Sequence, residues 1–203
     1  MELMSVALDD EESIIKKAVE TLANGGLIVY PTDTLYGIGA DAASKESVEK
    51  VFKVKRRSED NPLSVLVSDF RMLERYACMD EKQKELVHEL LPGRVSVILE
   101  SVGGLAPNLS KDGSLAFRIP LDHLAIRIAE RFGRPITSTS ANLHGHRMPE
   151  NVKGIIDQLG ENIAFYIDAG DLTFDASTLV DLRGSPRVLR EGMDLGEVKK
   201  VLR

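Results

Sequence analysis

The strongest indication of the fold is the stretch LIVYPTDTLYGIGADA, residues 27–42. Its first four residues form an apolar run that ends at a proline, which is typical of a buried strand. A turn rich in hydroxyl and carboxyl groups follows, and Gly37 and Gly39 allow the backbone to approach its neighbours closely. A buried strand that leads into a polar turn is typical of α/β proteins, which bind ligands at the carboxyl ends of their strands.

Outward from this stretch, helical and strand patterns alternate along the chain. Helices are predicted at residues 10–24, 44–55, 70–76, 81–90, 122–132, 150–159 and 195–202. Strands are predicted at residues 27–30, 63–67, 95–100, 115–120, 136–140, 163–167, 177–182 and 187–189. The alternation predicts an α/β fold with a mixed sheet, since some strands have short connections. No linker-like segment interrupts it, so we expect a single domain over residues 1–203.

The composition excludes several classes of protein. The 203 residues carry 26 Lys+Arg and 32 Asp+Glu, a net charge of −6, and 43% are hydrophobic, which fits a globular chain rather than a disordered one. The single cysteine, Cys78, excludes an intramolecular disulfide and a cysteine-based zinc site. We find neither an apolar run long enough for a membrane span nor a signal pattern, so we expect a cytoplasmic protein. The acidity argues against a DNA-coating protein but not against a local anion site.

The turn after the first strand contains two hydroxyl groups, from Thr32 and Thr34, and the carboxylate of Asp33. These groups could hold a small polar ligand at the end of the strand. They could equally cap the backbone of their own turn. The local sequence does not favour either interpretation.

A basic segment follows, with four more positive than negative charges between Lys45 and Arg57. One interpretation is a solvated helix end, where cations interact favourably with the helix dipole. The other is a phosphate site, in which Arg57 binds in a bidentate manner and Lys55 supplies a point charge. Taken alone, the segment favours the first interpretation.

Two later strand ends also contain polar side chains. In SLAFRIP, residues 114–120, Arg118 shares a strand face with Ala116, so it needs either an ion-pair partner or an anionic ligand. In ITSTSANLHG, residues 136–145, small donors and acceptors suit phosphate or ribose. Neither segment shows the pattern of a serine nucleophile, and His144 and His146 without a third ligand favour surface histidines over a metal site.

Together these segments resemble the YrdC/YciO family, whose active members are threonylcarbamoyl-AMP synthases. The resemblance runs from YPTDTLYGIGADA through KRRSEDNPL, LLPG, LAFRIP, STSANLHG and ASTLVD to VLREG. It implies a single α/β domain with a twisted mixed sheet flanked by helices and a concave, positively charged surface. It also implies that the chain corresponds to the catalytic domain alone.

The resemblance implies a reaction and a set of site residues. L-threonine, bicarbonate and ATP would form threonylcarbamoyl-AMP and pyrophosphate, with Mg²⁺ carried largely by the ATP phosphates. A downstream tRNA threonylcarbamoyl transferase would use the product for the t6A modification. The family signature falls on the expected catalytic residues Lys55, Arg57, Ser140 and Asn142. The implied ATP contacts are Lys55, Arg57, Asn61, Ser114, Asn142 and Arg190, and the implied threonine contacts are Thr34, Arg118, Ser140 and Ser177.

Two other functions remain open at this stage. A non-catalytic module that binds double-stranded RNA is favoured by the basic segment and disfavoured by the net acidity. A YciO-like paralogue that binds nucleotide is favoured by departures from the family pattern. Leu66 replaces a common histidine, Arg94 replaces a proline, and Glu150 replaces a threonine.

Overall fold

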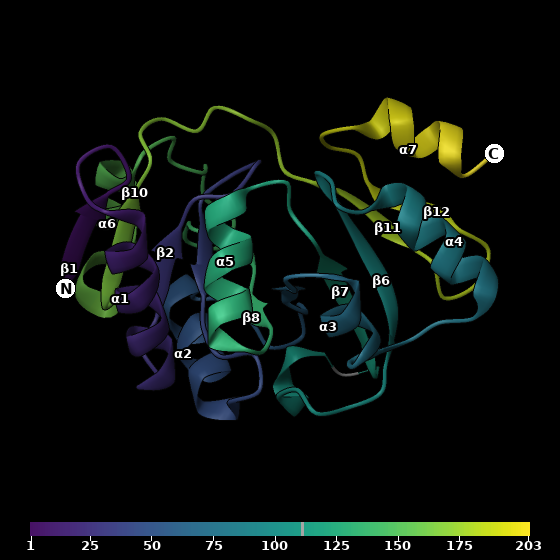
Figure 1. The fold of residues 1–203 in the computed structure, drawn as a ribbon, viewed down its shortest axis with the longest axis horizontal. Coiled ribbons are helices and arrows are strands. Elements are labelled where there is room, and N and C mark those ends of the chain that lie inside the picture. The colour runs from purple at the N-terminus through teal and green to yellow at the C-terminus, as the bar shows by residue number, and fades with distance from the viewer. Residues whose placement is uncertain (111) are drawn as a thin grey trace.

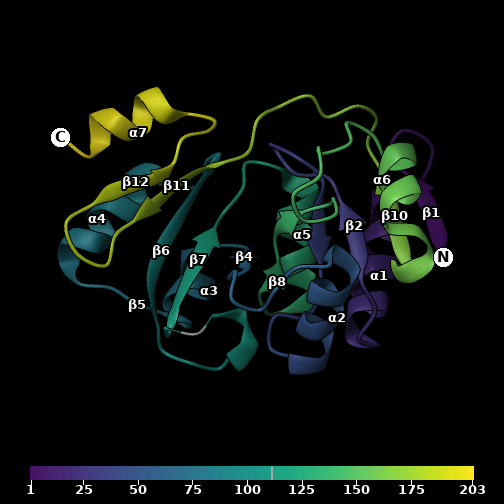
Figure 2. The same ribbon diagram turned by 180° about the vertical axis from the view of Figure 1, so that it is seen from behind.

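The strands of the computed structural model, which describes residues 1–110 and 112–203, form two mixed sheets that lie side by side (Figures 1 and 2). The first contains, in spatial order, β1 (Glu2–Ser5), β10 (Phe165–Asp168), β2 (Ile28–Tyr30), β3 (Gly37–Gly39) and β9 (Thr139–Ser140). The second contains β12 (Arg187–Arg190), β11 (Thr178–Asp181), β6 (Val95–Ser101), β7 (Ser114–Arg118), β4 (Ser64–Leu66) and β8 (Ile136–Thr137), with β5 (Ala77–Cys78) beside β6. Each sheet has parallel and antiparallel pairs, which confirms the predicted α/β fold while dividing its strands between two sheets.

Helices surround both sheets (Figures 1 and 2). They are α1 (Glu11–Ala23), α2 (Lys45–Lys55), α3 (Phe70–Glu74), α4 (Glu81–Leu90), α5 (His123–Phe132), α6 (Val152–Leu159) and α7 (Leu195–Val201). The first six begin where a side-chain oxygen accepts a hydrogen bond from the first turn, from Asp10, Ser44, Asp69, Asp80, Asp122 and Asn151 respectively. The longest helix of the described residues has 13, fewer than the ~20 needed to cross a bilayer.

The core explains why β2 is apolar at every position. Val29 belongs to the larger apolar cluster, which fills the space between the sheets and α2, α4 and α6. Ile28 and Tyr30 point to the opposite face, into a smaller cluster with α1 and α5. Because both faces of the strand are buried, no alternation of polar residues appears in its sequence.

The predicted strand at residues 136–140 is divided between the two sheets. Ile136 and Thr137 pair with β4, whereas Thr139 and Ser140 pair with β3. Between them, the Ser138 amide donates to the Ser64 carbonyl oxygen at 2.7 Å. This segment therefore links the sheets by backbone hydrogen bonds.

Strands β1, β3 and β5 were not predicted. In β3 the glycines are required by packing, since a Cβ atom on Gly39 would lie 2.7 Å from Ile28 Cγ1. The strand therefore depends on its neighbour β2 rather than on its own propensity.

Candidate functional site

A pocket of about 460 Å³ opens between the two sheets and is lined by both. Its size is in the range of small-molecule sites. Eight of the ten predicted site residues line it: Thr34, Arg57, Ser114, Arg118, Ser140, Asn142, Ser177 and Arg190. The connection from β10 to β11 crosses from one sheet to the other (Figures 1 and 2) and contributes Ala176 and Ser177 to the wall. The structure thus brings together segments that are far apart in the sequence.

Arg57 lies just after α2, where the left-handed backbone of Arg56 (φ 50°) ends the helix. Its guanidinium donates to the carbonyl oxygens of Asn61 at 3.1 Å and Pro62 at 2.8 Å. Asn61 is not among the residues that line the pocket. It is connected to the site by the hydrogen bond that its carbonyl oxygen accepts from Arg57. Burial, and then the neighbouring charge of Arg190, lower the pKa of Arg57.

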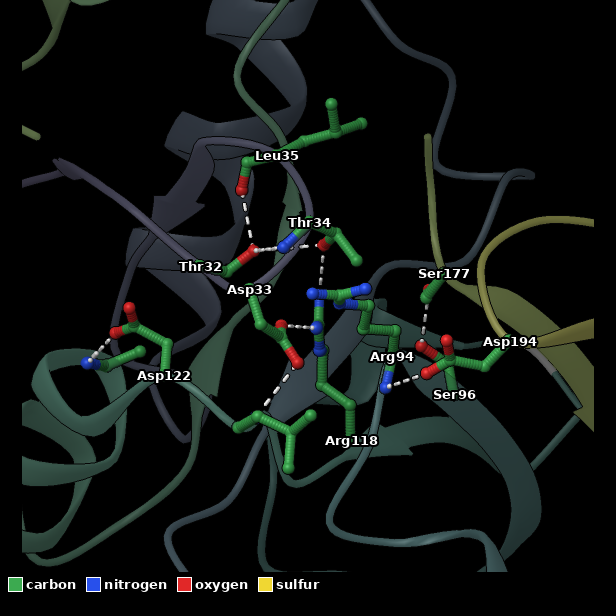
Figure 3. A network of polar contacts seen from close by, with 12 residues as sticks. Thr32, Asp33, Thr34, Leu35, Arg94, Ser96, Arg118, Asp122, Ser177 and Asp194 are labelled. Atoms are coloured by element: carbon green, nitrogen blue, oxygen red, sulfur yellow. Dashed lines mark hydrogen bonds and ion pairs between the residues drawn. The ribbon is translucent and has the colours of Figure 1, made fainter. Parts of the chain in front are cut away.

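Arg190, on β12, is oriented by Ser177. It donates to the Ser177 carbonyl oxygen from Nε (3.1 Å) and Nη2 (2.8 Å), and Nη2 also lies 3.1 Å from the hydroxyl. That hydroxyl is 3.0 Å from Ser96 Oγ, on β6 (Figure 3). Burial, and then the charge of Arg118, lower the pKa of Arg190. The three pocket arginines thus form a series, with Arg190 coupled to both of the others.

For Arg118 the sequence left open either an ion-pair partner or an anionic ligand, and the structure is compatible with both. Strand alternation places Ala116 and Arg118 on the pocket face of β7 and Phe117 in the core, as predicted. Arg118 Nη2 also forms an ion pair with Asp33 Oδ1, and Nη1 lies 3.2 Å from Thr34 Oγ1 (Figure 3). Its Nε is buried without a hydrogen-bond partner among the described residues. The arginine is therefore paired with a carboxylate and also lies in the pocket wall.

The hydrogen bonds of the Thr32–Thr34 turn have a defined direction. The Thr32 hydroxyl donates to the Leu35 carbonyl oxygen at 2.7 Å. In the 3.0 Å contact between the two hydroxyls, Thr34 must therefore be the donor. Since Thr34 Oγ1 also accepts from Arg118, it can present only a lone pair to a ligand.

Lys55 lies behind the pocket wall rather than in it. Its side chain is buried, and Nζ donates to the carbonyl oxygens of Ser140 and Asn142 (2.8 Å to the latter). The Lys55 carbonyl oxygen accepts from the His144 amide at 2.9 Å. Burial, and then the charge of Arg57, lower the pKa of Lys55 from 10.5 to about 7. In this geometry Lys55 organises the segment at residues 140–144, and its direct contact with ATP remains a prediction.

Ser140 and Asn142 are bonded to one another. The Ser140 hydroxyl donates to Asn142 Oδ1 at 2.7 Å, and Asn142 Nδ2 donates to the His146 carbonyl oxygen at 2.6 Å. These bonds leave lone pairs on Ser140 Oγ and one N–H on Asn142 for a ligand. Ser114 is similar, because its hydroxyl donates to Asp112 at 2.7 Å.

Ser138 and Thr139, from the segment expected to suit phosphate or ribose, also line the pocket, whereas Ser64, Ser96 and His146 were not assigned from the sequence. For Ser96 a signal was present, since a polar residue interrupts an apolar strand on the face it shares with Ile98. For His146 there was none, because its position depends on an irregular loop. Within residues 1–110 and 112–203, no group of three or more His, Cys, Asp or Glu side chains is arranged to hold a metal ion.

The departures from the family pattern lie around the pocket rather than in it. Leu66 is fully buried in the smaller apolar cluster. The Arg94 guanidinium lies 5.0 Å from the Phe174 ring centroid, on the β10–β11 connection. Glu150 forms an ion pair with Arg147 at 3.1 Å.

Comparison with known proteins identifies relatives along nearly the whole chain. The family model for Sua5, YciO and YrdC, described as "Telomere recombination", matches residues 20–192. A Mycobacterium tuberculosis protein named "Putative threonylcarbamoyl-AMP synthase" is 38% identical over 186 residues, covering 88% of this chain and 83% of its own length.

Two crystal structures have the same fold. Sua5 from Pyrococcus abyssi, complexed with L-threonine, matches with a TM-score of 0.92 and 29% identity over 99% of this chain. This chain spans 61% of that Sua5 chain. Escherichia coli YciO matches with a TM-score of 0.87 and 26% identity, covering 97% of this chain and 98% of its own.

Proposed function

The chain belongs to the Sua5/YciO/YrdC family, and from this membership we propose that it is an L-threonylcarbamoyladenylate synthase. In this reaction L-threonine, bicarbonate and ATP give threonylcarbamoyl-AMP and pyrophosphate, which makes the enzyme a nucleotidyltransferase. Relatives named threonylcarbamoyl-AMP synthase, and the Sua5 complex with L-threonine, support the assignment.

The observation that carries the proposal is the distribution of charge in the pocket. Three arginines line it, and none of its described lining residues is a carboxylate. Arg57 and Arg190 donate only to carbonyl and hydroxyl oxygens, so their charges are available to a polyphosphate. Arg118, which lines the pocket and whose charge is balanced by Asp33, suits the single carboxylate of an amino acid. One pocket therefore has room for both kinds of anion.

The chemistry requires positioning rather than a protein nucleophile. The threonine amine and bicarbonate form a carbamate with loss of water. A carbamate oxygen then attacks the α-phosphorus of ATP, and the bond to the leaving pyrophosphate breaks. Arg57 and Arg190 would stabilise the charge that develops on the phosphates, while Arg118 holds the threonine carboxylate. Lys55 would act by holding the Ser140–Asn142 segment in place.

Mg²⁺ would enter as part of the ATP substrate. Since no carboxylate is among the described residues that line the pocket, phosphate oxygens and water would be its ligands. In the cell we place the enzyme in the cytoplasm, as a single catalytic domain. There a tRNA threonylcarbamoyl transferase would consume its product for t6A, and direct contact with tRNA is part of the same proposal.

The test is mass-spectrometric detection of threonylcarbamoyl-AMP after incubation with ATP, L-threonine and bicarbonate. Pyrophosphate release should require both threonine and bicarbonate. Omitting each substrate in turn provides the control. Equal release without threonine would contradict the proposal.

A second candidate is a YciO-like nucleotide-binding paralogue. It is favoured by the overall match to E. coli YciO and by Leu66, which is buried among apolar side chains where the family pattern has a histidine. Such a protein would bind or hydrolyse ATP without making the threonylcarbamoyl product, so the same assay separates the two candidates.

A further inference from the structure

The three arginines of the pocket differ in their partners. Of these three arginines, only Arg118 has a carboxylate partner among residues 1–110 and 112–203. That partner is Asp33, and both side chains are 6% exposed. Arg57 and Arg190 have only carbonyl and hydroxyl partners. Arg118 lies against the turn that contains Asp33 and Thr34. Arg57 and Arg190 are held elsewhere in the wall, by Pro62 and Ser177 respectively, so the part of the pocket beside this turn is its Arg118 end. The pocket therefore has a neutral ion pair at one end and two uncompensated cations at the other.

We propose that Asp33 is a positioning residue that makes the Arg118 end of the pocket accept an amino-acid carboxylate and reject a phosphate group. The inference rests on the proposed function and adds the reason why the two anionic substrates do not exchange places. Its basis is the juxtaposition of Asp33, Arg118 and Thr34 (Figure 3).

The charge of Asp33 discriminates between anions by their valence. Next to a neutral pair, a group with two or more negative charges gains little attraction and is repelled by the carboxylate behind the arginine. A threonine zwitterion has one carboxylate, which the guanidinium of Arg118 in the pocket wall can meet, and one ammonium group. At the other end, Arg57 and Arg190 retain their full charge for the triphosphate.

The direction of the hydrogen bonds adds to this discrimination. Thr34 Oγ1 gives its proton to Thr32 and accepts from Arg118, so it offers only a lone pair. A lone pair favours the ammonium or hydroxyl group of threonine and repels phosphate oxygens. The orientation of the amino acid at this end is therefore set by the same turn that holds Asp33.

Asp33 is itself fixed by two contacts. One oxygen pairs with Arg118, and the other accepts from the Leu121 amide at 2.9 Å, at the turn between β7 and α5. Asp33→Asn removes the charge with almost no change in volume. Asp41→Asn is the matched control, because Asp41 is also buried and paired with an arginine, Arg134 (3.2 Å), and Arg134, unlike Arg118, does not line the pocket.

The experiment measures the affinity for L-threonine by calorimetry with and without saturating pyrophosphate. In the wild type and in Asp41→Asn, threonine and pyrophosphate should bind together, with threonine affinity changing less than about threefold. In Asp33→Asn, pyrophosphate should occupy the Arg118 end and weaken threonine binding by about tenfold or more. Circular dichroism checks folding, and Asp33→Ser removes the charge if the asparagine variant does not fold.

The outcomes separate this inference from the proposed function. If pyrophosphate leaves threonine binding in Asp33→Asn unchanged, or weakens it equally in the wild type, the inference is overturned. If the wild type binds no threonine, the proposed function fails, and a titration with pyrophosphate alone decides the inference. One pyrophosphate per wild-type chain and two per Asp33→Asn chain would support it, and equal numbers would overturn it.

Discussion

At the scale of single residues, two neighbours in the basic segment have different tasks. Arg57 points into the pocket and is held by two carbonyl oxygens. Lys55, two positions earlier, is 1% exposed and binds the backbone behind the pocket wall. The sequence showed both as cations but could not show which of them faces the ligand, because that depends on the left-handed turn at Arg56.

Replacing Arg57 with alanine should lower kcat/KM on the order of 100-fold or more while leaving the fold intact. The reason is the loss of a guanidinium that stabilises charge developing on the phosphates. Arg57→Lys should restore little activity, because an ammonium group lacks the bidentate geometry. Steady-state kinetics and circular dichroism measure these effects. Lys53→Ala and Arg56→Ala are the controls, and similar activity in all three alanine variants would contradict the role of Arg57.

The pH dependence of stability should report on Lys55. Its pKa falls from 10.5 to about 7 on folding, so between these values the unfolded chain binds more protons. The free energy of unfolding therefore rises with pH in this window, by as much as about 1.4 kcal/mol per pH unit. As the pH falls from 10.5 toward 7, the folded protein loses this stability, because the unfolded chain takes up the proton more readily than the folded one. Lys55→Met removes this titration and keeps all others. Chemical denaturation of both proteins across the window should show a difference that shifts toward the wild type as pH rises. A constant difference would mean that folded Lys55 stays charged.

At the scale of elements, the sequence predicted what depends on local chemistry. Helix α4 was predicted with its observed bounds, and the caps Asp10 and Ser44 set the starts of α1 and α2. The predicted strand at residues 136–140 proved to be two strands, since sheet membership is decided by partners distant in sequence. The glycine-rich β3 was missed for the same reason.

Thr137 should stabilise the junction between the sheets. Its hydroxyl accepts from the Ala40 amide at 2.9 Å and donates to the Ile38 carbonyl oxygen at 2.8 Å, fully buried. Thr137→Val keeps the shape and leaves both backbone groups without these bonds, so it should cost about 2–4 kcal/mol of unfolding free energy. Urea denaturation measures the change. The exposed Thr173→Val is the control, expected within about 0.5 kcal/mol. An equal effect at both positions would contradict the prediction.

At the scale of the whole molecule, overall charge and site charge have opposite signs. The chain has a net charge of −6, yet the pocket collects three arginines and, among its described lining residues, no carboxylate. The site was predictable because most of its motifs lie beside the end of a strand, and strands from both sheets meet at the pocket. The pairing of Arg118 with Asp33 was not, because the two residues are 85 positions apart in sequence.

The contrast between the negative net charge and the few local clusters of positive charge also predicts how the protein would interact with RNA. Outside the pocket, the exposed cations near the end of α2, such as Lys53 and Arg56, offer only a few phosphate contacts against an acidic background. With about three such contacts, raising the salt from about 50 to about 200 mM should weaken binding of a duplex RNA roughly 40-fold, because the released counterions drive such binding. Fluorescence anisotropy measures this change.

The double variant Lys53→Glu and Arg56→Glu should reduce RNA affinity further and leave ATP affinity unchanged, because ATP binding depends on Arg57 and Arg190. Tight RNA binding that resists both salt and charge reversal would require a recognition surface that these cations do not provide.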